Sequence, residues 1–167
     1  MTNDPQLRAT YEQCVDQCAD SLYRVAFRLL GNPDQATELV QETYLQAWKS
    51  LDQLRNRDHM KGWMFRILRN QYTKQLRHLS RTTQLESPDE ISVRHQSDTT
   101  ELVQLAISRL DEKHKLPILL VSMEGLSIEQ AAEALSLPRG TVLSRLHRAR
   151  QELKMILERL KIHEANG

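Results

Sequence analysis

The stretch from Leu126 to Arg150 constrains the fold of this chain most, because it predicts two helices joined by a tight turn. Ser127 is a favourable N-cap, and Gln130 stands three residues later, which completes a capping box. Pro138 ends the first helix, since proline has no backbone N–H and restricts the residue before it. Apolar side chains recur at helical spacing on the inner face of both helices: Ile128, Ala131, Ala132, Leu135, Val142, Leu146 and Ala149. This pattern predicts a helix-turn-helix.

The outer face of the second helix carries basic and small hydroxyl side chains. Between residues 139 and 161 there are seven Lys or Arg and two Glu, a net charge of +5. Phosphate contacts require positive charge, and a helix of this size fits the major groove of DNA. The alternative is a solvated basic surface with no ligand, which is common on amphipathic helices. The outer residues are Arg139, Thr141, Ser144, Arg145, His147, Arg148 and Arg150.

The rest of the chain is also predicted to be helical. Long stretches without Pro or Gly favour helices, and the few aromatic residues and five glycines argue against a β-sandwich or barrel. Residues that favour helix ends mark the first two helices. Pro5 follows two capping residues at the start of the first helix, Gly31 ends it, and Asn32-Pro33 begins the second. Further helices are expected over 60–79, 101–110 and 111–124, the last kinked at Pro117, with a polar loop over 52–59.

Charge is strongly segregated along the sequence. Residues 1–48 carry a net charge of −4, residues 49–81 carry +7, and residues 82–138 carry −6. Two basic blocks separated by acidic ones indicate two nucleic-acid contact surfaces. The stretch from Ser80 to Ser97 is polar and aperiodic, as in a flexible linker. We therefore expect an all-α protein with two small helical domains, at 1–80 and 99–167, joined by a linker at 81–98.

Two predicted helices in the first half carry polar surfaces that could bind partners. On the helix over 32–51, the outward residues are Thr37, Glu38, Gln41, Glu42 and Gln46, and Trp48 lies inward. Spacing alone favours a simple solvated face at these outward positions. The helix over 60–79 packs Trp63, Ile67 and Leu68 inward and is otherwise basic. Basic residues interleaved with amides and aromatic rings suit single-stranded or melted nucleic acid. A membrane-surface helix has similar charge, but the apolar face is needed for the core.

Several classes of function are not expected. No stretch of 18 apolar residues predicts a membrane span and no basic start precedes an apolar run, so a cytoplasmic protein without membrane insertion is expected. No phosphate loop, metal-binding motif or nucleophile elbow is found, so neither an enzyme nor a cofactor or metal site is predicted.

The two cysteines, Cys14 and Cys18, stand four residues apart and are expected to pack as small apolar side chains; redox or metal sensing is the alternative.

Taken together, these segments resemble a bacterial RNA polymerase sigma factor of the extracytoplasmic-function type. The resemblance runs from about residue 21 to residue 154. The first half is similar to sigma region 2 at residues 22–26, 36–42 and 62–70. The second half is similar to region 4 at residues 125–127, 138–142 and 144–150, and that last run, Ser-Arg-Leu-His-Arg-Ala-Arg, is specific.

The resemblance implies roles for particular residues and partners. Glu38, Gln41 and Glu42 would grip the coiled coil of the largest subunit of core RNA polymerase. The loop over 54–59 and the next helix would hold the melted −10 promoter element, through Trp63, Asn70 and Lys74. The −35 element would be read in the major groove by Arg139, Thr141, Ser144, Arg145 and Arg148. A partner anti-sigma factor that holds the two domains inactive is also implied.

The sequence departs from the family pattern at a few positions. Ser136 stands where the turn usually has glycine, so some strain is expected there, and Leu143 replaces a frequent basic residue, which removes a phosphate contact. Thr73-Lys74 stands where an acid often follows the position of Asn70, which bears on −10 specificity. A stand-alone helix-turn-helix regulator that binds palindromic operator DNA as a dimer is the alternative function, and an adaptor that reads no DNA is a third class.

Overall fold

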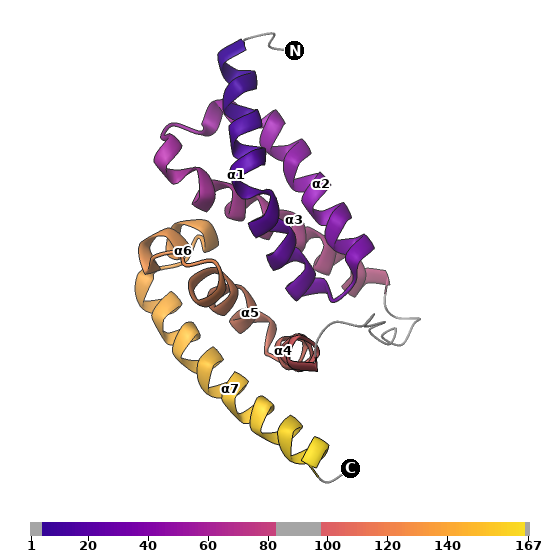
Figure 1. Ribbon diagram of the computed structural model, residues 1–167. Coiled ribbons are helices and arrows are strands. Elements are labelled where there is room, and N and C mark those ends of the chain that lie inside the picture. Colours follow the sequence, from indigo (N-terminus) through magenta and orange to yellow (C-terminus); the bar gives the residue numbers. More distant parts are fainter. Residues whose placement is uncertain (1–4, 83–97, 166–167) are drawn as a thin grey trace.

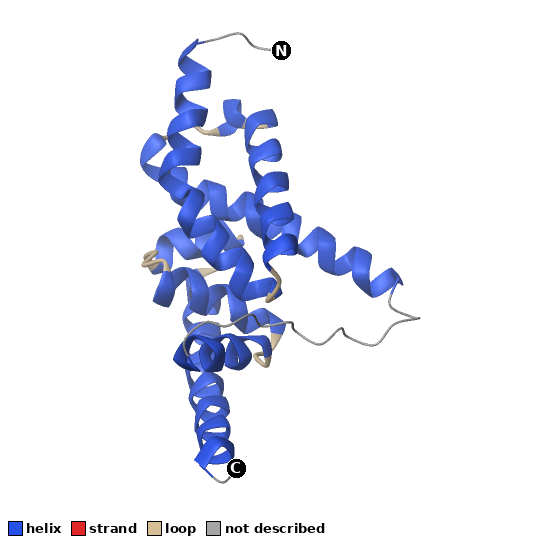
Figure 2. Ribbon diagram, turned by 45° about the vertical axis from the view of Figure 1, so that its right-hand side comes forward, coloured by secondary structure: helices blue, strands red, loops and turns tan. Residues whose placement is uncertain are grey.

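The computed structural model of the protein describes residues 5–82 and 98–165, and within these ranges every regular element is a helix (Figures 1 and 2). The predicted all-α fold of two small helical parts is confirmed. Most of the expected linker, residues 83–97, lies outside the described residues, as do the expected capping residues Asn3 and Asp4. The main helices are α1 (Pro5–Leu30), α2 (Pro33–Lys49), α3 (Met60–Thr82), α4 (Asp98–Ser108), α5 (Glu112–Ile118), α6 (Ile128–Leu135) and α7 (Arg139–Ala165).

The first turn between helices forms as the sequence predicts. Gly31 adopts φ = 65°, and its N–H donates to the Phe27 carbonyl at 2.8 Å, which ends α1. The Asn32 side chain then accepts hydrogen bonds from the N–H groups of Asp34 and Gln35 and caps α2. The 52–59 loop, however, holds two short 3₁₀ turns, η1 (Leu51–Gln53) and η2 (Arg57–His59).

Helices α1, α2 and α3 pack together around one part of the core (Figure 1). Phe65 of α3 is the largest completely buried side chain, and Leu22 of α1 and Leu39 of α2 are buried with it. The inner faces therefore have the helical period that the sequence predicts. The exception is Trp48, which is substantially exposed and packs edge-on against the Tyr11 ring, with centroids 5.0 Å apart.

In the second half, α5 begins and ends on local signals. The Asp111 side chain caps the helix by accepting from the Lys113 N–H. Pro117 lies inside the helix, and directly after it the backbone changes to a π-helical turn, η3 (Leu119–Met123). The sequence predicts a kink at Pro117, because proline cannot donate to the preceding turn, and the structure shows this π-helical turn from Leu119 onward. Gly125, at φ = 68°, then turns the chain into α6.

The helix-turn-helix is formed by α6 and α7. The Ser127 hydroxyl accepts from the Gln130 N–H, and the Gln130 side chain accepts from the Ser127 N–H, so both bonds of the predicted capping box are present. In the turn, Ser136 adopts a left-handed conformation with φ = 52° and ψ = 45°. A side chain with a Cβ is disfavoured in this region, which agrees with the strain expected where glycine is absent.

The variant Ser136→Gly is expected to stabilise the protein by about 1 kcal/mol, because glycine has no Cβ and reaches the left-handed region without this penalty. Denaturant unfolding of both proteins measures the difference. Ser144→Gly is the matched control, since Ser144 lies inside α7, where glycine should destabilise by about 0.5 kcal/mol. Equal effects at both positions would rule out backbone strain at the turn.

The two halves pack directly against each other. Helix α6 lies on α3 and α4 lies on α1, and the buried apolar side chains of both halves form one connected cluster. Figure 1 shows α6 beneath the start of α3 and α4 beneath the end of α1. The end of α3 projects away from the remaining helices in Figure 2. This arrangement decides which of the predicted site residues reach the surface.

Candidate polymerase and nucleic-acid interfaces

The outward face of α2 is an exposed acidic surface. Glu38, Gln41 and Glu42 are all exposed, and among the residues that the structure describes no hydrogen bond or ion pair holds their side chains. Leu45, an exposed large apolar side chain, continues the same face at helical spacing. Sequence reasoning did not single out Leu45, although its spacing from Glu38 and Gln41 was a usable signal. We call Glu38, Gln41, Glu42 and Leu45 the α2 face.

On α3 the predicted −10 residues separate into two groups. Asn70 and Lys74 are exposed one turn apart, and the Asn70 side-chain oxygen accepts from Arg69 at 2.8 Å. Trp63 is only 5 % exposed and belongs to the core. Its neighbour Gly62 lies against α6, where an added Cβ would approach the Gln130 carbonyl oxygen to 3.8 Å. In this arrangement the Trp63 ring cannot stack on a base, so the structure does not group it with Asn70 and Lys74.

Beside this packing, a groove of about 440 Å³ runs between the later part of α3 and the second half of the protein. Arg69 and Thr73 of α3 line one side, and Leu116 of α5 and Arg145 of α7 line the other. Arg145, a predicted −35 residue, is therefore half-buried beside the basic helix of the first half. The groove is lined by Arg69, Tyr72, Thr73, Leu76, Asp111, Glu112, Lys113, Leu116, Pro117, Leu135, Leu137 and Arg145.

Tyr72 and Glu112 connect the two sides of this groove. The buried Tyr72 hydroxyl donates a hydrogen bond to the Glu112 carboxylate, which also pairs with Lys115 at 2.9 Å. Burial of the ring and the bond to Glu112 both raise the pKa of Tyr72 above its ordinary value. The Tyr72 hydroxyl therefore stays neutral and donates this hydrogen bond between the two halves.

The start of α7 presents the predicted −35 residues at different depths. Arg139, Ser144 and Arg148 are exposed, whereas Thr141 and Arg145 are half-buried. Arg139 pairs with Glu129 of α6, and because both side chains are largely exposed, this pair contributes little stability and can exchange for a phosphate. The structure thus brings all five residues onto the first three turns of one helix.

A buried carboxylate fastens the two halves together. The Glu124 side chain is 1 % exposed and accepts two hydrogen bonds from the Arg24 guanidinium of α1, at 3.1 and 3.0 Å. The Lys61 ammonium of α3 donates to the Glu124 carbonyl at 2.7 Å and lies 3.8 Å from its carboxylate. We call Arg24, Lys61 and Glu124 the clamp. Sequence analysis missed it, because no period or spacing links residues 100 positions apart.

Two further polar contacts cross the same boundary. The Gln104 side chain of α4 donates to the carbonyls of Phe27 and Arg28 at the end of α1, and Arg28 donates back to Gln104 at 3.1 Å. His59, in the loop predicted to meet the −10 element, lies 3.2 Å from the Glu133 carboxylate of α6. The loop that the resemblance assigns to the −10 element is therefore in contact with the helix-turn-helix through His59.

The cysteines behave as packing residues. Cys14 and Cys18 are both buried and free of disulfides. Burial, with a smaller contribution from the Cys14 thiol, raises the pKa of Cys18 to about 11. Cys18 therefore stays protonated at neutral pH, which disfavours reactivity and metal binding. Within residues 5–82 and 98–165 no group of His, Cys, Asp and Glu side chains is placed to hold a metal ion.

None of the helices in the described part of the chain combines the length and apolarity needed to cross a bilayer. The described surface of the protein thus has an acidic face with an exposed leucine on α2, a basic face on α3, and a basic helix at the start of α7. These surfaces suit contacts with a protein and with nucleic acid.

Comparison with known proteins agrees with this reading. Residues 14–82 match the family model of sigma-70 region 2, and residues 100–153 match that of sigma-70 region 4. The ECF RNA polymerase sigma factor EcfG of Rhodopseudomonas palustris is 32 % identical over 82 % of this chain and 79 % of its own length. SigL of Mycobacterium tuberculosis, also an ECF sigma factor, is 31 % identical over 93 % of this chain and 91 % of its own length.

Two more comparisons concern the length of a relative and the three-dimensional structure of another. The ECF sigma factor SigE of Mycolicibacterium smegmatis is 30 % identical over 92 % of this chain, which spans 63 % of the length of that relative. The sigma factor RpoE of Bartonella quintana, solved in complex with the anti-sigma factor NepR, superposes with a TM-score of 0.77 at 29 % identity. That alignment covers 89 % of this chain and 96 % of the solved one.

Proposed function

The chain belongs to the extracytoplasmic-function sigma factors of bacterial RNA polymerase, and we propose on this premise that it binds core polymerase and directs initiation at specific promoters. The observation that carries the proposal is the order of its parts: a region 2 match that includes the basic helix α3, followed by a region 4 match that includes the helix-turn-helix. Such a factor positions DNA and polymerase, performs no covalent step of its own, and acts in the cytoplasm with the polymerase.

The α2 face is the proposed contact for core polymerase. Its carboxylates and amide are exposed and unengaged, so binding would break no contact within the described part of the protein. Leu45 adds an apolar side chain that association can bury, and burial of apolar surface is a main source of binding free energy. A partner surface with basic residues around an apolar patch would be complementary to this face.

Region 4 is the proposed −35 reader. The first turns of α7 would enter the major groove, as the second helix of a helix-turn-helix does, with Arg139, Thr141, Ser144, Arg145 and Arg148 facing DNA. Guanidinium groups can bind guanine edges in bidentate fashion or neutralise phosphates. The short, exposed pair of Arg139 with Glu129 leaves that arginine available.

The −10 element is the proposed ligand of α3, through Asn70, Lys74 and, after a rearrangement, Trp63. Asn70 and Lys74 are already exposed, but the Trp63 ring is buried in the part of α3 on which α6 packs, so its contact with melted DNA would follow separation of the two halves. We assign the packed arrangement to the polymerase-free protein. Since the similar RpoE structure contains an anti-sigma factor, a partner of that kind that stabilises the packed form is part of the proposal.

Reconstitution with purified bacterial core polymerase tests the function. The expected result is a stoichiometric complex and transcripts that start at defined positions on a genomic template library, with none from core polymerase alone. A protein that instead binds a palindromic duplex by itself, as a symmetric dimer, would be the alternative stand-alone regulator. Binding to polymerase without promoter-dependent transcripts would indicate an adaptor.

The variant Arg145→Ala is expected to weaken binding to the −35 element by about 1 to 3 kcal/mol if its guanidinium makes a bidentate base contact. The loss should concentrate at one base pair, and holoenzyme binding across a set of single-base promoter variants measures it. Arg159→Ala is the matched control, because it removes the same charge from an exposed position farther along α7. An unchanged base preference in the Arg145 variant would remove this residue from the base-reading set.

A further inference from the structure

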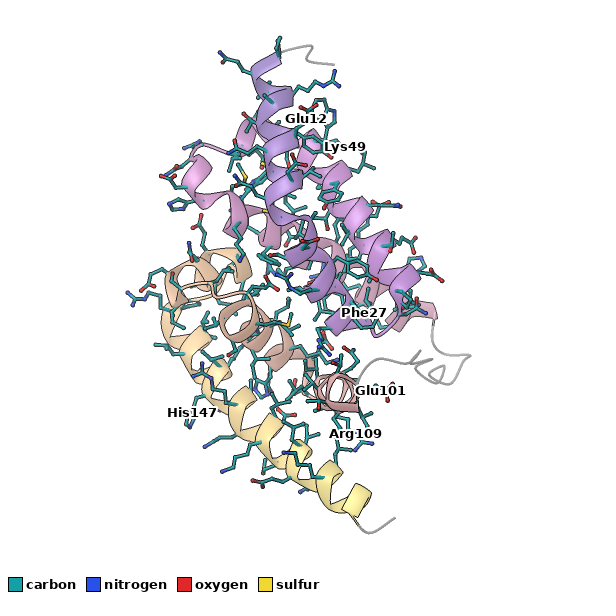
Figure 3. All side chains as sticks on the ribbon, in the orientation of Figure 1. Glu12, Phe27, Lys49, Glu101, Arg109 and His147 are labelled. Atoms are coloured by element: carbon teal, nitrogen blue, oxygen red, sulfur yellow. The ribbon has the colours of Figure 1, made fainter. Side chains whose placement is uncertain are left out.

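One side of the proposed reading helix carries an apolar side chain among polar ones. Arg139, Leu143 and His147 lie four residues apart on α7 and form one exposed ridge. Leu143, in the middle, is 50 % exposed. Figure 3 shows the His147 side chain pointing outward from α7, away from the other helices. The ridge therefore faces open space rather than the rest of the protein.

Leu143 has no packing role that would explain it. The core side of α7 is already filled by Val142, Leu146 and Ala149, all of which are buried. A single exposed leucine is ordinary on a protein surface. Its position is informative here, because it lies in the second turn of the helix whose N-terminal residues reach base edges in a helix-turn-helix. It is also flanked by Ser144 and by the exposed Arg139 one turn earlier.

We propose that Leu143 is a specificity-determining residue that reads a thymine of the −35 element through the thymine C5-methyl group. This inference rests on the proposed −35 role of α7. Among the base edges in the major groove only thymine presents an apolar group, whereas guanine, adenine and cytosine present donors or acceptors. An isobutyl side chain cannot hydrogen-bond, so it gains from covering the methyl group and loses where it covers a polar edge.

The expected effect is modest and measurable. Removing a methyl group from a closely packed apolar contact weakens binding by about fourfold, given the usual free energy of burying one carbon group. Uracil differs from thymine by that methyl group alone, so a thymine-to-uracil exchange isolates it without changing base pairing. Because Leu143 would contact one thymine, the exchange should weaken binding at that base pair only.

The experiment begins with selection of promoters by the holoenzyme from a duplex library randomised across both promoter elements. Three holoenzymes are compared: the natural protein, Leu143→Ala, and the matched control Met155→Ala. Met155 is similarly exposed, at 52 %, but lies 12 residues later on α7, about 18 Å along the helix axis and beyond the reading turns. The selected −35 duplex is then prepared with uracil at each thymine in turn, and its affinity for each holoenzyme is measured.

We expect one thymine in the −35 element at which uracil weakens the natural holoenzyme and the Met155 variant by about fourfold and the Leu143 variant hardly at all. Selection by the Leu143 variant should lose its preference for thymine at that same position. Equal sensitivity of all three proteins, or no sensitivity at any thymine, would overturn the role of Leu143. A natural holoenzyme that selects no −35 sequence would instead refute the proposed promoter reading itself.

Discussion

Replacing Arg24 by methionine is expected to lower the free energy of unfolding by about 2 to 3 kcal/mol. Methionine keeps an unbranched apolar stem but removes the guanidinium and its charge, so the Glu124 carboxylate loses both of its hydrogen bonds from α1. Because that carboxylate is almost inaccessible to water, its charge is left buried with only Lys61 nearby. Removing one partner of a buried ion pair typically costs 3–5 kcal/mol, and the 53 % exposure of Arg24 places this pair below that range.

Arg8 provides the matched control for the clamp. It pairs with Glu12 at 3.0 Å within α1, and both side chains are largely exposed. The same substitution, Arg8→Met, should change stability by less than about 0.5 kcal/mol, because exposed ion pairs contribute little. Denaturant unfolding of the two variants and the natural protein gives the comparison.

A double-mutant cycle sharpens the test of the clamp. If Arg24 acts through Glu124, Arg24→Met should have a much smaller effect in a Glu124→Gln background, since glutamine leaves no buried charge behind. Equal losses in both backgrounds would show that Arg24 stabilises the protein in another way, such as packing of its aliphatic stem. Equal losses for the Arg8 and Arg24 variants would contradict the distinction between buried and exposed pairs.

The double variant Glu38→Ala, Gln41→Ala is expected to weaken binding to core polymerase by about 100-fold, or roughly 3 kcal/mol. Both side chains belong to the α2 face, and their removal deletes a charge and an amide at positions one turn apart. Alanine is a strong helix former, so α2 should remain intact. Titration of labelled protein with core polymerase measures the affinity, and circular dichroism checks the fold.

The helix α1 offers a matched control for this variant. Gln13 and Asp16 are also exposed and also stand three residues apart, so Gln13→Ala, Asp16→Ala removes the same kinds of group from a different face. Natural affinity in the control and a large loss in the Glu38 variant would support the α2 face as the polymerase contact. Natural affinity in both would place that contact elsewhere, without bearing on the −35 proposal for α7.

The helices and their ends are local features, and the sequence alone determined most of them. Asn32, Asp111 and Ser127 act within three residues of their partners, so a reader of the sequence can find each cap. Pro117 likewise predicted irregular backbone near the end of α5, and Ser136 predicted strain in the turn before α7. The exposed residues of α2 and the order of the two basic surfaces also followed from helical period and charge.

What only the tertiary structure decided is how the two halves meet. Helical spacing predicted that Trp63 faces inward, whereas the family resemblance implied a DNA contact, and in the packed arrangement Trp63 is buried. Arg24 and Glu124 become partners because α1 and the turn before α6 are brought together, although 100 residues separate them. The local sequence pattern predicts which face of a helix is apolar, but it does not predict which distant element covers that face. The covering element depends on packing summed over the whole core.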